Sequence, residues 1–245
     1  MPDFSQMKLG RRAIRHSSFR KLLAQPVFDA LPQAPPTQDN TNGITQWGAL
    51  ANDYLNDCTC AGIGHSFQIA TLNTGIEASV TDADVIGLYE AYCGYNPANP
   101  APDQGGIEDD VLLGIQQHGF MGAKLLGWVS INPLNTEHVR QAIAYFGSVY
   151  FGAEMPLSAQ NQAVWDVVAG QQGVPGGWGG HAMVSAKYDA GGMEFITWGE
   201  NQPASWQFWL FYADECHALL WDVWLKRFPL ASQKTILNML QGVSS

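Results

Sequence analysis

Apolar residues recur at helical spacing through the first half of the chain. Residues 58–74 are apolar on most faces and contain no proline, a pattern typical of a central helix packed on all sides. Further helices are predicted to begin near Thr81, to span residues 107–118 and to span residues 135–146. Thr81 is the expected N-cap of its helix, because Asp84 stands three residues later and completes a capping box.

The second half alternates between apolar and polar positions instead. Residues 148–153, 181–188, 193–198 and 206–212 are each predicted to be a strand, and glycine-rich turns separate several of them. The last stretch, 213–240, is predicted to be helical with an interruption near Pro229. Helices followed by consecutive strands indicate an α+β fold with an antiparallel sheet.

The composition is that of a folded protein with an acidic body. Of the 245 residues, 46% are hydrophobic and 14% are charged, which excludes a disordered chain or a coiled coil. Apolar runs stay well short of the roughly 20 residues that a membrane span needs, so we expect no membrane partner. The net charge of −10 disfavours a nucleic-acid partner, since phosphate binding requires clustered lysine and arginine.

The first 28 residues form a distinct basic segment. Residues 1–21 hold six of the 12 lysines and arginines but one of the 22 acidic residues, and a helical patch is expected near Phe19, Leu22 and Leu23. Residues 29–43 are rich in proline and asparagine and are predicted to be an extended linker. A basic segment attached to an acidic body either lies on that body or reaches a partner, and the sequence leaves both open.

Four cysteines, Cys58, Cys60, Cys93 and Cys216, are too few for a disulfide scaffold in a chain of this length. The first residues contain no apolar region of the kind found in secretory signals. We therefore expect reduced thiols and a cytoplasmic location. No cofactor and no metal site is predicted.

Cys58 is the first candidate for chemistry, because it stands where a loop becomes the predicted central helix. The positive end of a helix dipole lowers the pKa of a thiol, and the thiolate is the nucleophilic form. The alternative is a small buried apolar residue, which is a common role for a free cysteine. Cys60 points roughly 200° around the same helix and is expected to face the core.

His181 and Asn52 are the candidate partners of Cys58. His181 follows a glycine-rich turn and opens a predicted strand, where an imidazole is able to take the thiol proton and return it to a leaving group. Asn52 lies six residues before Cys58, and its amide is able to join a backbone N–H in an oxyanion hole. The alternatives are a hydrogen-bonded histidine at a strand end and an ordinary asparagine in a turn.

Five segments in order resemble parts of the papain-like cysteine peptidases. The segment ITQWGALANDYLNDCT resembles the family's entry to its catalytic cysteine, and DQGGIEDDVLLGIQQHGFMG resembles its Gly-Gly loop and following helix. VRQAIAYFGSVYFGAEM resembles the first helix and strand of its second domain, GGHAMVSAKY its histidine strand, and FITWG its strand before a Trp-Gly pair.

The resemblance, to a divergent member of bacterial or phage type, implies a role for each candidate. Cys58 becomes the nucleophile, His181 the base and Asn52 the oxyanion amide in place of the family's glutamine. Thr197 falls where the family has the asparagine that orients the histidine, and Trp198 falls where its tryptophan shields that contact. The implied reaction is cleavage of a peptide or amide bond through a thioester, with hydrolysis and transfer both open; the alternative is a catalytically inactive binding or structural protein of the same fold.

The resemblance also implies a domain organisation. A papain-like domain would span residues 29–240, with a helical half at about 44–135, a β half at about 136–212 and a helical extension at 213–240. A cleft between the two halves would hold a peptide or protein substrate. The inhibitory propeptide of secreted members is longer than the basic segment, which is nevertheless able to cover such a cleft. No oligomeric state is predicted.

Overall fold

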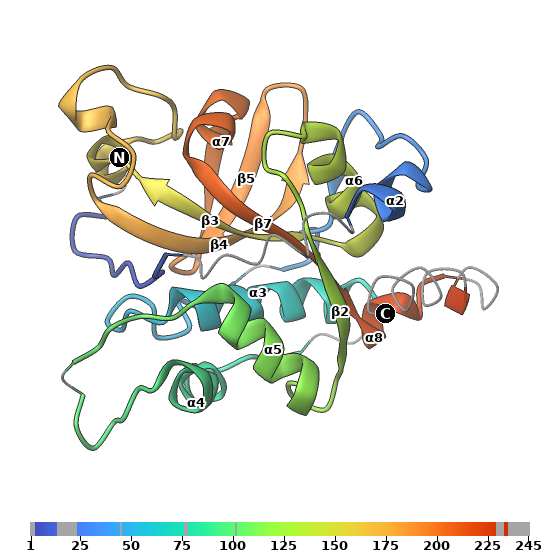
Figure 1. Cartoon of the computed structure of the whole chain (residues 1–245), viewed down its shortest axis with the longest axis horizontal. Helices are drawn as coiled ribbons and strands as arrows, with labels where there is room; N and C mark the ends of the chain where they lie inside the picture. Colours follow the sequence, from blue (N-terminus) through green and yellow to red (C-terminus); the bar gives the residue numbers. More distant parts are fainter. Residues whose placement is uncertain are drawn as a thin grey trace.

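The computed structural model describes residues 3–13, 24–44, 46–75, 78–100, 102–228 and 233–234. A helical layer and an antiparallel sheet pack against each other, with the central helix between them (Figure 1). The α+β class predicted from the sequence is confirmed. The helical patch expected near Phe19, Leu22 and Leu23 lies outside the described residues.

Four helices are predicted before the strands, and three of them, α3 (Cys58–Leu72), α4 (Asp82–Cys93) and α5 (Glu108–His118), form the helical layer (Figure 1). The fourth, α6 (Thr136–Phe146), packs against the sheet instead, next to the short helix α2 (Ala24–Asp29). Thr81 caps α4 through the predicted capping box with Asp84. Helix α3 is buried from Cys58 to Thr71, as expected of a helix without a polar face.

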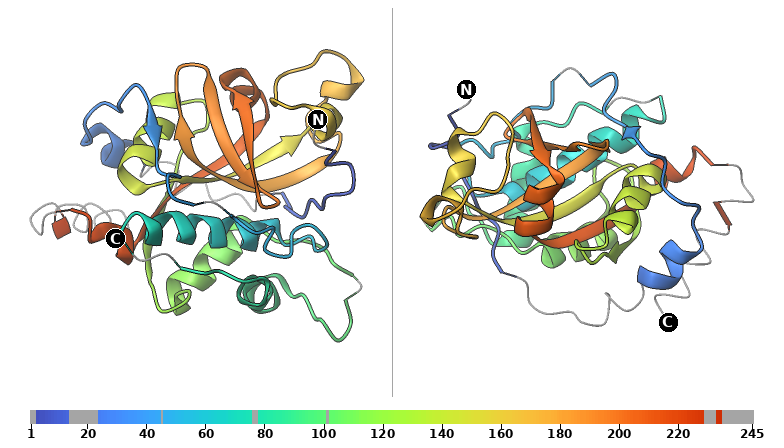
Figure 2. Two further views of the ribbon diagram at one scale, coloured as in Figure 1. Left: turned by 180° about the vertical axis from the view of Figure 1, so that it is seen from behind. Right: turned by 90° about the horizontal axis from the view of Figure 1, so that it is seen from above.

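The sheet is antiparallel and has the order β2-β7-β3-β4-β5-β6, with β1 beside β4. Its strands are β1 (Gln38–Asp39), β2 (Leu125–Ser130), β3 (Val149–Met155), β4 (Gly179–Tyr188), β5 (Gly192–Thr197), β6 (Glu200–Ser205) and β7 (Ala213–Trp221). Two short 3-10 helices, Leu157–Asn161 and Gln171–Gly173, lie in the connection from β3 to β4. Figure 2 shows the sheet and the helical layer from behind and from above.

The prediction of a strand at 206–212 is wrong, because this segment is helix α7 (Trp206–Tyr212). Ser205 caps it by accepting a hydrogen bond from the amide of Phe208. Phe208, Trp209 and Tyr212 are buried while Leu210 and Phe211 are exposed, which is helical spacing. The run of adjacent aromatic residues conceals this period.

The prediction of a helix beginning at 213 is also wrong, because residues 213–221 form strand β7, and only Asp222–Leu225 (α8) is helical within 213–228. Strand β7 lies between β2 and β3 and is buried from Glu215 to Trp221. A strand buried on both faces loses the alternation that identifies strands in a sequence. Strand β2, within the range predicted as the helical half, pairs with β7 and was missed.

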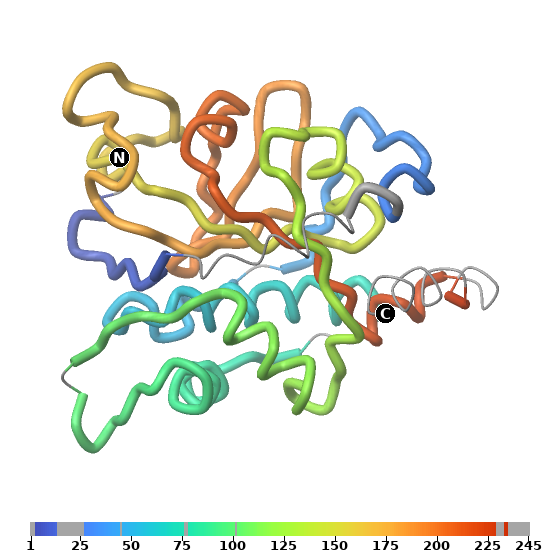
Figure 3. Tube along the Cα trace, viewed as in Figure 1, coloured from blue at the N-terminus to red at the C-terminus, as the bar shows by residue number. Residues whose placement is uncertain are grey.

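Residues 4–12 of the N-terminal segment lie between the helical layer and the sheet. In Figure 3 their blue trace follows the boundary between the helical layer and the sheet. We call residues 4–12 the arm. The described basic residues Lys8, Arg11 and Arg12 belong to it. No described helix is long and apolar enough to cross a membrane.

Candidate active site

Cys58 is the first residue of α3, and its side chain is fully buried. Its sulfur accepts hydrogen bonds from the backbone amides of Gly10, at 3.3 Å, and Ala182, at 3.4 Å. Ala182 directly follows His181 on β4, so two residues 124 positions apart are in direct contact. The fold therefore brings the start of the central helix against the strand that carries the candidate base.

His181 is fully buried on β4, opposite Ala153 of β3. Its Nε2 lies 2.6 Å from the hydroxyl oxygen of Thr197, the last residue of β5. The ring of Trp198 stacks on the imidazole with 4.5 Å between centroids. The hydroxyl and the indole together hold the plane of the ring. The roles that the resemblance implies for Thr197 and Trp198 stay predictions.

The second ring nitrogen of His181 is buried and has no hydrogen-bond partner among the described residues. When Nε2 donates its proton to Thr197, Nδ1 holds the lone pair of the neutral ring. A buried polar atom without a partner is unfavourable unless it has a use. Nδ1 is therefore free to accept a proton. It belongs to the residue next to Ala182, whose amide contacts the Cys58 sulfur.

Burial suppresses the charge of both groups in this closed arrangement. Burial raises the pKa of Cys58 to about 12, although the amides of Ala182 and Gly10 act in the opposite direction. Burial, and then the charge of Arg11, lowers the pKa of His181 to about 3. The sequence predicted a lowered pKa for Cys58 from its helix position, and the structure gives the opposite because the sulfur is fully buried.

Asp57 precedes Cys58, and its side chain makes no capping hydrogen bond to α3. Burial raises the pKa of this carboxyl to about 8. Burial therefore favours the neutral form of Asp57, whose charged form would raise the pKa of Cys58.

Asn52 lies buried in the loop before α3, where its amide donates to the carbonyl of Leu55 at 3.1 Å. The hydrogen bond that the structure gives this amide therefore stays within its own turn. The role of Asn52 in an oxyanion hole stays a prediction. The backbone N–H of Cys58, at the start of α3, is the more direct donor near the sulfur.

The other candidate residues have structural partners. His65 lies seven residues after Cys58, about two turns along α3. Its Nε2 contacts the carbonyl oxygen of Gly48 at 3.0 Å, which holds the preceding loop against the helix. Cys60 faces Cys93 of α4 with 3.8 Å between the sulfurs. The prediction that Cys60 faces the core is confirmed, and all four cysteines are free thiols.

The sequence left open whether the basic N-terminal segment covers the cleft or reaches a partner, and it did not predict which residues of the arm contact the site. The Arg11 amide donates to Gly180 at 3.1 Å and the Arg12 amide to Gly106 at 2.8 Å, while the Gly106 amide donates to Gly10 at 2.8 Å. The indole of Trp198 donates to the carbonyl of Lys8 at 3.1 Å. The arm therefore binds the sequence-predicted Gly-Gly loop on one side and the histidine strand on the other, directly over Cys58.

Glycine is required where the arm passes closest to the body. A Cβ on Gly10 would overlap the backbone carbonyl of Asn56, and a Cβ on Gly105 would overlap the backbone of Gly10. Backbone atoms cannot rotate aside as a flexible side chain does. The arm fits this path because both sides of the contact lack side chains.

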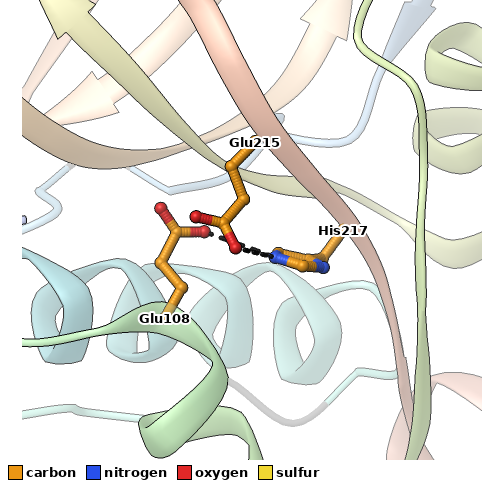
Figure 4. A group of neighbouring side chains, drawn as sticks. All are labelled: Glu108, Glu215 and His217. Carbon is orange, nitrogen blue, oxygen red and sulfur yellow. Dashed lines mark hydrogen bonds and ion pairs between the residues drawn. The ribbon is translucent and has the colours of Figure 1, made fainter. Parts of the chain in front are cut away.

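A cluster of ionisable side chains lies near Cys58, between α5 and β7. Glu108, Glu215 and His217 are buried, and one ligand-type atom of each lies within 4.8 Å of the others (Figure 4). His217 contacts Glu215 at 3.1 Å and Glu108 at 3.6 Å through Nε2, while its Nδ1 contacts the hydroxyl of Ser130 at 3.1 Å. Donor types of this kind also bind divalent metals, but here the guanidinium of Arg11 lies 3.3 Å from Glu108.

Solved structures with this fold are cysteine proteases. Xylellain, a cysteine protease from Xylella fastidiosa, is 12% identical, with 88% of this chain and 96% of that chain covered and a TM-score of 0.68. The ragweed pollen allergen Amb a 11, a cysteine protease solved in its proform, is 13% identical over 79% of this chain and 67% of that chain, with a TM-score of 0.58.

Digestive procathepsin L 3 of Tenebrio molitor larval midgut is 12% identical over 78% of this chain and 71% of that chain, with a TM-score of 0.55. No family model matches the sequence, and no curated protein matches it. At these identities the likeness establishes the papain-like fold.

Proposed function

We propose that this protein is a papain-like thiol peptidase that its own arm holds closed. The observation that carries the proposal is the contact of the Cys58 sulfur with Ala182, beside a histidine whose Nδ1 is buried and lacks a partner among the described residues. A nucleophile, a base and a group that orients the base are the parts that acyl transfer needs. The substrate class is a peptide or protein, as for the cysteine proteases of the same fold.

The reaction follows from the roles of Cys58 and His181. Nδ1 of His181 takes the thiol proton, and the sulfur attacks the carbonyl carbon of the scissile amide. The developing oxyanion is stabilised by N–H groups at the start of α3 together with the amide of Asn52. His181 then donates the proton to the leaving amine as the C–N bond breaks, and a thioester forms on Cys58. Water, deprotonated by His181, hydrolyses this thioester and releases the thiol.

The arm supports the proposal because it occupies the path that a substrate would need. Gly106 both donates to and accepts from the arm backbone, which is how an extended peptide is held by main-chain hydrogen bonds. The Gly10 amide points at the sulfur, where a scissile bond would lie. A substrate must therefore displace the arm before Cys58 is able to react. Two proteins with this fold were solved as proform or proenzyme.

The experiment opens the arm and measures the reactivity of each cysteine. Gly10→Ala places a Cβ against the Asn56 carbonyl, and overpacking of this kind costs about 1–3 kcal/mol, so alkylation of Cys58 by iodoacetamide should rise about tenfold to a hundredfold. Gly87→Ala in α4 is the matched control, since a Cβ there meets no atom within 4 Å. Mass spectrometry distinguishes Cys58 from the half-buried Cys93, which should dominate the labelling of the closed protein.

Peptide cleavage in the Gly10→Ala protein completes the test. Cleavage that is lost in both Cys58→Ala and His181→Ala variants supports the peptidase. Rapid labelling of Cys58 without cleavage of any peptide in a diverse library would favour the alternative, a papain-fold protein that binds peptides and does not cleave them. A Gly10→Ala protein that labels Cys58 no faster than wild type would contradict closure by the arm.

A further inference from the structure

The side chain of Arg11 is buried beside the nucleophile and is surrounded by carboxylates. Its side chain is 1% exposed. It pairs with Glu108 at 3.3 Å, with Glu154 at 3.6 Å and with Asp214. Burial opposes the charged form of Arg11, but Glu108, Asp214 and Glu215 outweigh burial and raise its pKa above the ordinary value. The guanidinium is therefore a buried cation held by the charge of its surroundings.

Three elements build the pocket around this side chain. Glu108 opens α5, Glu154 lies on β3, and Asp214 and Glu215 lie on β7. Glu108 and Glu215 are buried and form the floor, whereas the side chains of Glu154 and Asp214 are 41% and 37% exposed and form the rim. Gly152 on β3 leaves the space open, because a Cβ at that position would overlap the Arg11 guanidinium.

The pocket contains more carboxylates and more hydrogen-bond acceptors than Arg11 satisfies. Four carboxylates surround one guanidinium, and both carboxylate oxygens of Glu108 accept no hydrogen bond from the described residues. Arg11 likewise donates none from Nε or Nη1 among these residues, although both atoms are buried. Burial, and then the charge of Glu215, raises the pKa of Glu108, so this carboxyl lacks full compensation. Arg11 has a charge opposite in sign to that of the pocket. It nevertheless leaves buried hydrogen-bonding atoms of Glu108, and of its own guanidinium, without partners among the described residues.

We propose that this carboxylate pocket is a substrate specificity site that binds an arginine side chain. This inference rests on the proposed function and specifies that the peptide substrate of the peptidase carries an arginine. In the arm, Gly10 lies at the Cys58 sulfur and the next residue places its side chain in the pocket. A peptide on the same path presents its arginine from the residue adjacent to the one that Cys58 attacks. Arg11 occupies the site until the arm is displaced.

Two other uses of the same residues are outcomes of the test. Glu108, Glu215 and His217 have the donor types of a divalent-metal site once Arg11 withdraws. The pocket is otherwise an anchor for the arm that contributes nothing to substrate choice. The groups facing the guanidinium and its floor are Glu108 from α5, Glu154 from β3, and Asp214, Glu215 and His217 from β7.

The first experiment measures binding without cleavage. The full chain carrying Cys58→Ala and Gly10→Ala is titrated with fluorescent peptides that contain arginine, citrulline or leucine at one position. Citrulline has nearly the shape of arginine without its charge. Because charge-assisted hydrogen bonds are stronger than neutral ones, the arginine peptide should bind about tenfold to a hundredfold more tightly than the citrulline peptide. Equal affinity for the two peptides would overturn the proposal.

Pocket variants then assign the preference to its residues. Asp214→Asn at the exposed rim and Glu108→Gln at the floor should each reduce the arginine-to-citrulline ratio severalfold. Glu90→Gln, an exposed residue of α4, removes the same charge at a distance and should leave the ratio unchanged. The Asp214 variant keeps the test valid should the Glu108 variant fail to fold. A ratio unchanged in the folded rim variant would contradict the assignment.

Cleavage and metal binding separate this proposal from the proposed function. With Cys58 intact, the cleavage sites in the peptides are mapped. Each cleaved bond should belong to the residue adjacent to the arginine, so the spacing between the arginine and the cleavage site should be constant. Arginine-selective binding without cleavage would retain the pocket and reject the peptidase. Cleavage without arginine selectivity would retain the peptidase and reject the pocket. Binding of Zn²⁺ that excludes the arginine peptide would assign the cluster to a metal and overturn the proposal.

Discussion

The two flanks of helix α3 each bury a thiol, but only one surrounds it with groups able to use it. On the flank facing the sheet, the Cys58 sulfur receives two backbone N–H groups and lies beside the strand of His181. On the flank facing α4, the Cys60 sulfur has another thiol at 3.8 Å and the hydroxyl of Thr59 at 4.0 Å. Burial raises the pKa of both thiols, Cys58 and Cys60. The difference lies in the neighbours, and in the arm, whose Gly10 contacts the Cys58 sulfur.

The largest expected effect separates the two thiols directly. In the Gly10→Ala protein, Cys58→Ser should abolish peptide cleavage, because the hydroxyl oxygen is a poor nucleophile at its ordinary pKa without further activation. Cys60→Ser should retain most of the activity, since its neighbour is Cys93 and not the base. Initial rates measured on folded protein, checked by circular dichroism, test this. Loss of activity in the Cys60 variant alone would reverse the assignment of the two flanks.

The next effect compares the two buried histidines. His181→Ala removes the proposed general base and should lower kcat/KM by roughly 10²–10⁴-fold. His65→Gln keeps a donor for the carbonyl of Gly48 and should change kcat/KM little. The comparison requires equal amounts of folded protein, because His65 is buried in the core. Comparable losses in both variants would mean that burial, and not proton transfer, explains the His181 result.

Acid should open the arm, and the sign follows from His181. In the closed form burial lowers the pKa of His181 to about 3 from an ordinary value of 6.5. The open form therefore binds a proton that the closed form excludes as pH falls through this interval, and protonation favours opening. Hydrogen exchange of the Gly10, Arg11 and Arg12 amides, corrected for intrinsic rates, should show loss of protection between about pH 7 and pH 4.

The His181→Ala protein is the control for this pH dependence. Its arm retains the Arg11 ion pairs, so any loss of protection that remains in this variant does not come from the imidazole. The wild-type protein should lose protection at a higher pH than the variant. Identical profiles would exclude the imidazole as a contributor to arm opening.

The smallest expected effect concerns the group that orients the base. Thr197→Val keeps the shape of the side chain and removes the hydroxyl that contacts His181 at 2.6 Å. A net hydrogen bond contributes about 0.5–1.5 kcal/mol, so kcat should fall about twofold to tenfold. Ser185→Ala on β4 removes a hydroxyl that bonds the carbonyl of Glu194 and should not change kcat. A loss as large as that of His181→Ala would give Thr197 a direct part in proton transfer.

The sequence predicted most of the elements that carry the site. Helix α3 starts at Cys58 and β4 carries His181, as expected from the helix pattern and the glycine-rich turn. The prediction failed after residue 205, where adjacent aromatic residues hide the helical spacing of α7 and burial on both faces hides the strand character of β7. The cytoplasmic location stays a prediction.

Local chemistry was therefore readable from the residues alone: where the helix begins, where the histidine strand starts, and which side of the helix each cysteine faces. These depend on interactions within a few residues of one another. The contacts of the arm and the carboxylates around Arg11 depend on residues 10, 108, 152, 154 and 214, which meet only after α5, β3, β7 and the arm are packed together. The pKa values of Cys58 and His181 depend on the same packing, because the exclusion of water is a property of the assembled fold and not of any segment.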